Sequence, residues 1–484
     1  MRQLTRNIVL LSCAILPMGV MAQKPVESFD QFRKSILASY NDYRNEALSQ
    51  YAKYLDSIWV EYPQHAGLER NPVPKPKDIP KAEEKKPKSD DKVPPTPDRR
   101  PDVGSTPTVT PIAKPDIPTP PAPKGEICVS FYGMPLTMED VAYAIPDRLT
   151  RKNSSDLWRC MYESGTDKRV IAEIRRVADE MNLNDYFIYE LTRSYVETKF
   201  GDRTPFTRDA LIHFLLCNMG YDVRFAETVS GTSLILMPCN QTVFGHTYII
   251  IDGKNYYVFG DSTLPQGEAI YTCYLPSDFQ LGKSFEMQLG ELRLPYKPQQ
   301  FCVEYDGITL RGEINANLYP MLYHYPQMPI GDYAASVVDG KLRQTIVSQM
   351  SEALKDNGRR DKVERMLHFT QSAFEYATDK ENHGFEKPYF FEEMLFYPKS
   401  DCEDRAIFYS YLLYRVAGVE NHLISYPGHE CVSVTMPSEA IEGTSYDYEG
   451  KVFFISDPTY IGATTGMCMP QYRSMKPNID YIYK

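Results

Sequence analysis

The sequence lacks the features that mark membrane-spanning, metal-binding and nucleic-acid-binding proteins. Beyond Ala22 it has no uninterrupted apolar run of the roughly 18 residues needed to cross a membrane. No C-x-x-C, H-E-x-x-H or EF-hand spacing occurs, and the eight histidines are not clustered at ligand spacing. A formal net charge of -11 without a basic patch argues against a nucleic-acid surface. We therefore expect no metal, no cofactor and no nucleic-acid partner.

The chain begins with a segment typical of a secretory signal. Arg2 and Arg6 precede the mostly apolar residues 8–20, and a small-residue cleavage pattern ends at Ala22. This predicts an exported protein, periplasmic or extracellular, that is cleaved near Ala22. A lipoprotein signal at Cys13 is the weaker alternative, because the apolar run continues beyond that residue. Without Cys13 an odd number of the ten cysteines remains, so at least one thiol is expected to be free.

Two segments of contrasting composition follow the signal. Residues 23–62 are predicted to form an amphipathic helix, because Ser28 and Gln31 make a capping box and apolar residues then recur every three or four positions. Its apolar face requires a partner, either the body of the protein or another helix. Residues 63–124 hold nearly half of the chain's 37 prolines and cannot build a core. We interpret this Pro-rich segment as a tether, in preference to a ligand for SH3-type domains.

Beyond the Pro-rich segment the sequence contains one unit twice, at residues 125–299 and 300–484. Three stretches of the first unit match stretches of the second in the same order, which predicts a tandem duplication. The matches are EICVSFYGMPL from Glu126 with QFCVEYDGITL from Gln300, FTRDALIHFLL from Phe206 with CEDRAIFYSYLL from Cys402, and DGKNYYVFGDS from Asp252 with YEGKVFFISDP from Tyr448.

The second unit predicts a buried helix followed by an antiparallel sheet. Residues 404–417 are apolar on nearly all sides, as in a helix buried on several faces, and Gly418 can end it. Residues 422–426, 430–436 and 451–456 are short segments rich in Val, Ile and Phe, which predict strands. A helix packed on such a sheet indicates an α+β fold.

Cys402, His429 and Asp457 are the candidate catalytic residues. Cys402 lies at the start of the buried helix, where unpaired backbone N–H groups and the helix dipole favour a thiolate. His429 opens a strand after a Pro-Gly pair and can serve as a base, and Asp457 ends a strand where it can orient the imidazole. Each residue alone has a structural alternative: a packing cysteine, a satisfied histidine and a turn carboxylate.

Together the three residues resemble the transglutaminase-like superfamily. The motifs that carry the resemblance are Cys402-Glu403-Asp404-Arg405-Ala406, Gly428-His429 and Asp457-Pro458-Thr459. The resemblance covers about residues 300–484, and residues 126–299 more weakly. It implies the circularly arranged α+β fold of papain-like thiol enzymes, in two tandem domains. After the histidine, Glu430-Cys431 replaces the family's more usual Ala-Trp.

The resemblance implies a mechanism in which the Cys402 sulfur attacks an amide carbonyl, His429 transfers a proton to the departing nitrogen, and Asp457 orients the imidazole. Tyr397 is the candidate side-chain donor to the oxyanion. In the first unit Phe206 stands in the nucleophile's place, while His246 and Asp261 match the other two residues. We therefore interpret residues 125–299 as a degenerate copy.

Three functions remain open at this stage. Water as the acceptor gives a peptidase or amidase acting on a protein or peptide, and a lysine amine gives a cross-linking transglutaminase. We favour hydrolysis, because no calcium-loop pattern suggestive of cross-linking enzymes is present. The third function is an inactive binding or scaffold protein with the same fold.

Overall fold

The computed structural model describes residues 125–260, 269–273 and 282–484, the strand Trp59–Tyr62, Lys81, Ala82 and scattered positions between Ala38 and Leu55. The expected signal, most of the Pro-rich segment and Asp261 lie outside these residues. The described positions between Ala38 and Leu55 are helical, as expected. Trp59–Tyr62, however, form strand β1, so the predicted helix does not reach residue 62. Within the described parts, no helix is long and apolar enough to cross a membrane.

Both halves of the molecule open with a β-hairpin of the same geometry. In the first half β2 (Glu126–Phe131) pairs with β3 (Met134–Glu139), and in the second β9 (Pro298–Tyr305) pairs with β10 (Ile308–Asn315). Both two-residue turns end in glycine, and all four turn residues have positive φ, between 47° and 82°. Such turns match the twist of the strands they join. The two hairpins coincide with the first matched pair of sequence stretches.

Helices follow each hairpin, and one of them packs centrally on the sheet. Helix α5 of the first half packs on β5, and α11 of the second packs on β14. The first half contains α2 (Ser155–Ser164), α3 (Asp167–Met181), α4 (Asp185–Phe200) and α5 (Pro205–Asn218). The second contains α6 (Leu318–Tyr323), α7 (Ile330–Ala335), α8 (Gly340–Ala353), α9 (Arg359–Ser372), α10 (Asp379–Asn382), η1 (Phe391–Leu395), α11 (Cys402–Leu412), the π-helical turn η2 (Leu413–Ala417) and η3 (Pro470–Tyr472).

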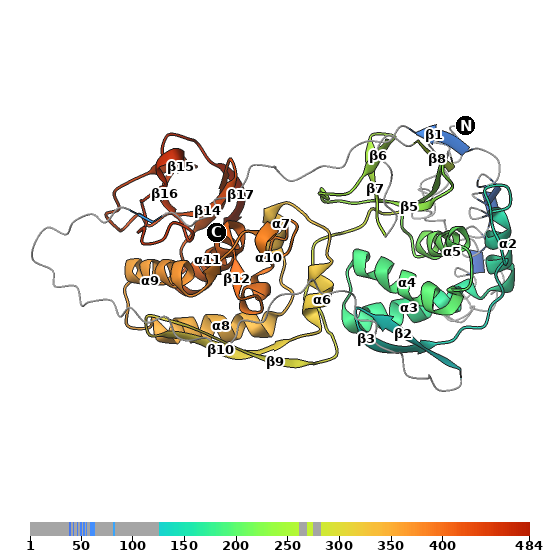
Figure 1. Cartoon of the computed structure of the whole chain (residues 1–484), viewed down its shortest axis with the longest axis horizontal. Coiled ribbons are helices and arrows are strands. Elements are labelled where there is room, and N and C mark those ends of the chain that lie inside the picture. Colours follow the sequence, from blue (N-terminus) through green and yellow to red (C-terminus); the bar gives the residue numbers. More distant parts are fainter. Residues whose placement is uncertain are drawn as a thin grey trace, which may run out of the picture. The chain divides into compact units, whose positions relative to one another are not determined.

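The two sheets share one strand order. The first sheet runs β1-β8-β4-β5-β7-β6 and the second runs β17-β13-β14-β16-β15, with antiparallel neighbours throughout (Figure 1). The strands are β4 (Arg224–Thr228), β5 (Ser233–Pro238), β6 (Tyr248–Ile251), β7 (Lys254–Val258), β8 (Ile270–Cys273), β13 (Asn421–Tyr426), β14 (His429–Val434), β15 (Ser445–Tyr448), β16 (Lys451–Ser456) and β17 (Asn478–Tyr483); β11 (Glu375–Tyr376) and β12 (Lys399–Ser400) form a separate parallel pair. Removing β1 makes the two orders identical position by position, which supports the duplication.

The α+β class is therefore as expected, and each half carries one curled sheet. The predicted buried helix and its three strands appear within a few residues of their expected bounds. Residues Ala52–Lys484 form one compact unit. Tyr325 of the second half packs its ring against Tyr186 and Phe187 of α4 and accepts a hydrogen bond from Asn184 at 2.6 Å.

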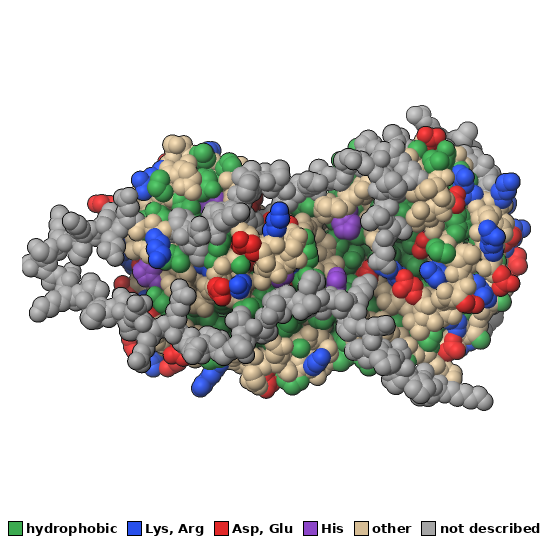
Figure 2. Space-filling model, viewed as in Figure 1, with side chains coloured by type: hydrophobic (Ala, Val, Ile, Leu, Met, Phe, Trp, Pro, Cys, Tyr) green, Lys and Arg blue, Asp and Glu red, His purple; other side chains and the backbone are tan. Residues whose placement is uncertain are grey.

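The described surface carries both signs of charge. On the face drawn in Figure 2, Lys and Arg side chains are interspersed with Asp and Glu side chains, and no broad basic field is visible. The face drawn therefore carries no large field of one sign.

Candidate functional site

Cys402 is the first residue of α11, and its neighbours fix the start of that helix. Asp401 is the N-cap, and its N–H donates to Asp404 Oδ2 at 3.0 Å in a reciprocal capping box. Only 1% of Cys402 is exposed. Its Sγ donates to Glu403 Oε2 at 3.1 Å, so this arrangement holds the thiol in its protonated form.

A buried arginine balances the carboxylates around this helix start. Arg405 donates to the Phe374 and Gln371 carbonyls at 2.8 and 3.2 Å. Burial lowers the pKa of Arg405 to about 10, while the nearby Asp401 and Asp404 oppose this shift. The guanidinium therefore stays positive at neutral pH, and it places a fixed charge next to Cys402.

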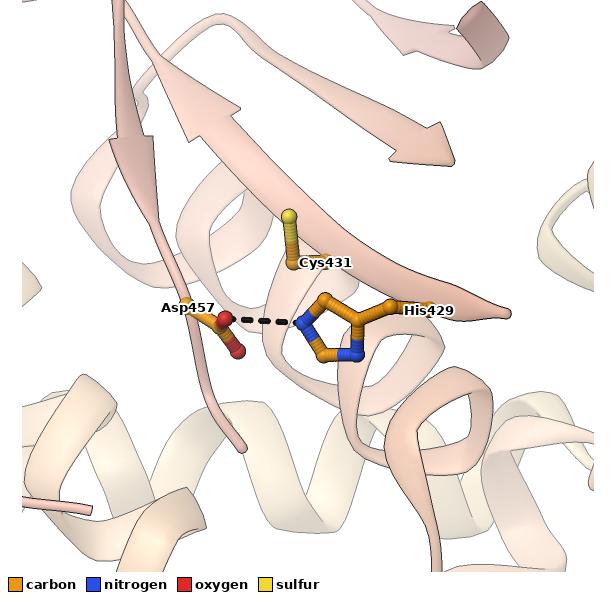
Figure 3. Close-up of side chains that lie close together, drawn as sticks. All are labelled: His429, Cys431 and Asp457. Carbon is orange, nitrogen blue, oxygen red and sulfur yellow. Dashed lines mark hydrogen bonds and ion pairs between the residues drawn. The ribbon is translucent and has the colours of Figure 1, made fainter. Parts of the chain in front are cut away.

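His429 and Asp457 form a buried hydrogen-bonded pair. His429 is the first residue of β14, Asp457 directly follows β16, and His429 Nε2 lies 2.8 Å from Asp457 Oδ2 (Figure 3). Asp457 Oδ1 accepts from the backbone N–H groups of Thr459 and Tyr460 at 2.8 and 3.2 Å. Both carboxylate oxygens are thus occupied, which fixes the orientation of the imidazole.

The second nitrogen of the imidazole has no partner among the described residues. His429 is 2% exposed, yet its Nδ1 makes no hydrogen bond. In Figure 3 this nitrogen points away from both Asp457 and Cys431. An unpaired buried nitrogen costs about 1–3 kcal/mol, and such groups are uncommon in folded proteins. The ring is therefore oriented by one nitrogen and available for chemistry at the other.

The ionisation of His429 follows from its burial and its partner. Burial alone would lower the pKa of His429, but the charge and hydrogen bond of Asp457, with a smaller contribution from Cys431, raise it well above its usual value of 6.5. We therefore expect an imidazolium at neutral pH, which is the form that stabilises a thiolate.

An aromatic ring covers the imidazole. Tyr472 of η3 stacks on His429 with ring centres 5.3 Å apart and planes 7° apart, and it also stacks on Tyr426. Burial raises the pKa of the Tyr472 hydroxyl, and the positive charge of His429 opposes this shift. Tyr472 therefore forms part of the cover over the candidate site.

A buried glutamine organises the loop that carries Asp457. Gln371 Nε2 donates to the carbonyls of Asp457, Tyr460 and Ala463 at 3.0, 2.9 and 3.0 Å. Its Oε1 accepts from Gly462 N–H at 3.1 Å. Nothing in the local sequence of Gln371 indicates this role, because its partners are about 90 residues away.

Two glycines fix the far end of this loop by direct backbone contact. Thr444 N–H donates to Gly466 O at 2.8 Å, and Gly466 N–H donates to Ile455 O at 2.7 Å. A Cβ on Gly443 would collide with the backbone of Gly466, and a Cβ on Gly466 would collide with the backbone of Glu442. Both glycines also have positive φ, 136° and 96°.

Cys431 is a neighbour of the pair that the sequence did not single out. Burial raises the pKa of its thiol to about 12, although the hydrogen bond with His429 opposes the shift, so the thiol stays protonated. His429, Cys431 and Asp457 also place nitrogen, sulfur and oxygen donor atoms within 4.8 Å of one another. This donor set suits Zn²⁺, so these are the described side chains with the chemistry to hold a metal here.

Tyr397, the candidate oxyanion donor, lies buried between other aromatic rings. It is 3% exposed, and its hydroxyl makes no hydrogen bond with any described residue. Burial raises the pKa of Tyr397, so the hydroxyl keeps the proton that a donor needs.

The structure corrects the residues matched in the first half. Counted from the helix start, Pro205 stands in the place of Cys402, and Phe206 lies one position later. His246 precedes β6, the counterpart of β15, and its Nδ1 bonds to the Val258 carbonyl at 3.0 Å. The strand equivalent to β14 is β5, whose sequence SLILMP contains no histidine.

The counterpart of Asp457 also differs from the expectation. The same dipeptide, Gly-Lys, stands at the start of β7 and of β16. Counting the same number of residues onward from Lys254 and from Lys451 shows that Gly260, rather than Asp261, is equivalent to Asp457. The described part of the first half therefore carries no thiol, imidazole or carboxylate at the three positions.

The site is closed in this structure. A surface cavity of about 440 Å³ lies elsewhere, beside β3, α3 and the segment 293–295, and contains none of the candidate residues. Comparison of the chain with protein-family models, curated proteins and solved structures finds no match. The functional argument therefore depends on the geometry of the site.

Proposed function

We propose that the second half is an exported thiol enzyme that cleaves amide bonds, with Cys402 as nucleophile, His429 as the proton-transfer group and Asp457 as the positioning residue. One observation carries the proposal: His429 is held at Nε2 by Asp457 while its buried Nδ1 has no partner among the described residues. His383 and His422 also each have one buried nitrogen without a hydrogen bond to the described residues, but their other nitrogen bonds to a tyrosine hydroxyl, whereas that of His429 bonds to a carboxylate, which favours the charged imidazole.

The chemistry follows from the charges around the helix start. The Cys402 thiol gives its proton to the Glu403 carboxylate to which it already donates a hydrogen bond, the thiolate attacks the amide carbonyl, and the imidazolium of His429 gives a proton to the departing nitrogen. Water then releases the acyl group from sulfur. The N–H groups at the start of α11 can donate hydrogen bonds to the developing oxyanion, with Tyr397 as a further donor.

Activation requires two local changes from the closed arrangement. The Cys402 sulfur must leave Glu403, and the cover that includes Tyr472 must open toward the substrate. Both changes involve side chains, and neither disturbs the hydrogen bonds of Asp457.

The thiol assignment is tested by alkylation with iodoacetamide between pH 5 and 9, with the modified cysteine located by mass spectrometry. We expect Cys402 to react at neutral pH and the rate to fall at least tenfold in His429→Ala. Cys431→Ser is the matched control, because it removes the other thiol near the imidazole and should leave the labelling of Cys402 intact. Labelling that is independent of His429 would refute the assignment.

The reaction type is tested by measuring released amino termini or ammonia beside incorporation of a primary amine. Hydrolysis predicts release without incorporation, and a cross-linking transglutaminase predicts both. Cys402→Ala must abolish either signal.

An inactive binding protein is the second candidate, and the burial of Cys402 favours it. A nucleophile with 1% exposure and a hydrogen bond to Glu403 is protected from any substrate in this arrangement. Under this alternative Cys402 would resist alkylation at every pH at which the protein stays folded.

A further inference from the structure

A short piece of the Pro-rich segment lies against the loop that carries Asp457. Ala82 N–H donates to the Ile461 carbonyl at 2.9 Å, and Lys81 forms a parallel β-bridge with Ile461. In Figure 1 this piece is blue, against the red of the second half. Lys81 is exposed and Ala82 is half-buried. The contact joins residues far apart in the sequence within one compact unit.

The surface under Ala82 adjoins the candidate site. Ala82 packs on an apolar cluster formed by Ile424, Tyr426, Cys431, Ile455, Tyr460, Ala463, Cys468, Met469 and Tyr472. Two members of this cluster, Cys431 and Tyr472, are direct neighbours of the His429 imidazole. The apolar cluster on which Ala82 packs thus extends to the His429 imidazole.

The loop itself joins this contact to the His429–Asp457 pair. Its first residue is Asp457, and Ile461, which accepts the hydrogen bond from Ala82, lies between two residues bonded to Gln371. A strand added at Ile461 therefore restrains the same backbone that positions the Asp457 carboxylate.

We propose that the outer edge of residues 457–463 is a docking site for an extended peptide strand, and that its occupant is this chain's own segment around Lys81–Ala82. Docking fastens the Pro-rich segment to the second half and restrains the loop of Asp457. The docking itself does not depend on the proposed enzymatic activity.

The chemistry of the segment suits this mode of binding. The sequence places a proline directly before Lys81, and proline restricts the conformations open to an unbound chain, which lowers the entropy lost when a strand is added. Backbone hydrogen bonds then provide affinity, and the small side chain of Ala82 fits against the cluster while Lys81 remains in solvent.

The covalent connection makes a weak contact sufficient. The segment is joined to the same compact unit through Tyr62 before it and Gly125 after it. Such a tether gives an effective concentration on the order of millimolar, so a contact of millimolar intrinsic affinity is already substantially occupied.

The docking is tested by hydrogen exchange of the full-length protein, followed by mass spectrometry. We expect amides in peptides spanning residues 78–86 to exchange at least tenfold more slowly than those spanning residues 90–98. Ala82→Asp, which places a charge on the apolar cluster, should abolish this protection and accelerate exchange in residues 457–463. Ala113→Asp is the matched control, because it makes the same change elsewhere in the Pro-rich segment, and it should alter neither region.

A second variant and two further measurements complete the test. Ala82→Pro removes the N–H that donates to the Ile461 carbonyl, and it adds no charge. It should therefore also accelerate hydrogen exchange in residues 457–463. A synthetic peptide of residues 76–86, added to Ala82→Asp, should restore slow exchange there. Equal exchange of residues 78–86 and 90–98 in the unmodified protein would overturn the proposal, as would protection that rises with protein concentration, which indicates a second copy as occupant. Neither result bears on the alkylation of Cys402, so the two proposals fail separately.

Discussion

Replacing Gln371 should destabilise the loop that carries Asp457, and the structure gives the size of the effect. The side chain is 1% exposed and engages two N–H hydrogens and one carbonyl oxygen with backbone groups of the loop. At about 1 kcal/mol for each of these three hydrogen-bonding positions, Gln371→Ala should lower the free energy of unfolding by about 3 kcal/mol. Gln371→Glu should cost at least as much, because a carboxylate oxygen then faces carbonyl oxygens in place of the N–H donors.

The measurement is urea unfolding monitored by tyrosine and tryptophan fluorescence, with the slope m used to check that the unfolding transition is unchanged. Gln349 is the matched control: its side chain also holds a backbone position, Arg311, through bonds of 2.9 and 2.8 Å, but at an exposed place on α8. We expect less than about 1 kcal/mol for Gln349→Ala. If Gln371→Ala and Gln349→Ala had equal effects, the loop would not depend on Gln371.

Three further predictions concern the His429–Asp457 pair and the Tyr472 ring that covers it. The pKa of His429 is raised in the folded state, so protonation of His429 stabilises the protein fully below about pH 6.5. This stabilisation is lost as the pH rises toward the pKa of His429 in the folded protein, by up to about 1.4 kcal/mol per pH unit. Asp457→Asn should flatten this pH dependence of stability in urea titrations, and an unchanged slope would contradict the pairing. Iodoacetamide should modify Cys402 before Cys431, whose pKa is raised to about 12, and the reverse order in peptide mapping would exclude Cys402 as the reactive thiol. Tyr472→Ala should increase the alkylation rate of Cys402 at least tenfold whereas Tyr472→Phe, which keeps the stacked ring, should not; equal rates would show that Tyr472 does not limit access.

Local sequence signals anticipated much of the second half. The helix start at Cys402 and the strand bounds around His429 and Asp457 follow from capping, periodicity and β-branched content, which depend on residues close in sequence. The two hairpins were not predicted, although their turns carry a local signal: a two-residue turn with positive φ at both positions favours glycine at one of them.

The parts that sequence reasoning missed depend on distant contacts or on strand order. Gln371 and Ala82 acquire their roles only when the chain folds, and no local pattern marks either of them. His246 was matched to His429 because both follow a glycine, whereas their equivalence depends on which strand follows them in the sheet. The strand equivalent to β14 is β5, which follows a longer connection and contains no histidine.

The contact between Gly443 and Gly466 also affects how a saturation-mutagenesis screen of this protein would be interpreted. A Cβ at Gly443 would collide with the backbone of Gly466, and a Cβ at Gly466 would collide with the backbone of Glu442. Every substitution at either glycine should therefore be depleted, whichever activity is selected. Depletion at these glycines would then resemble that at His429 and Asp457, although its cause is a failure to fold. Measuring the abundance of each variant beside its activity would separate the two groups, because substitutions that affect only the chemistry leave abundance unchanged.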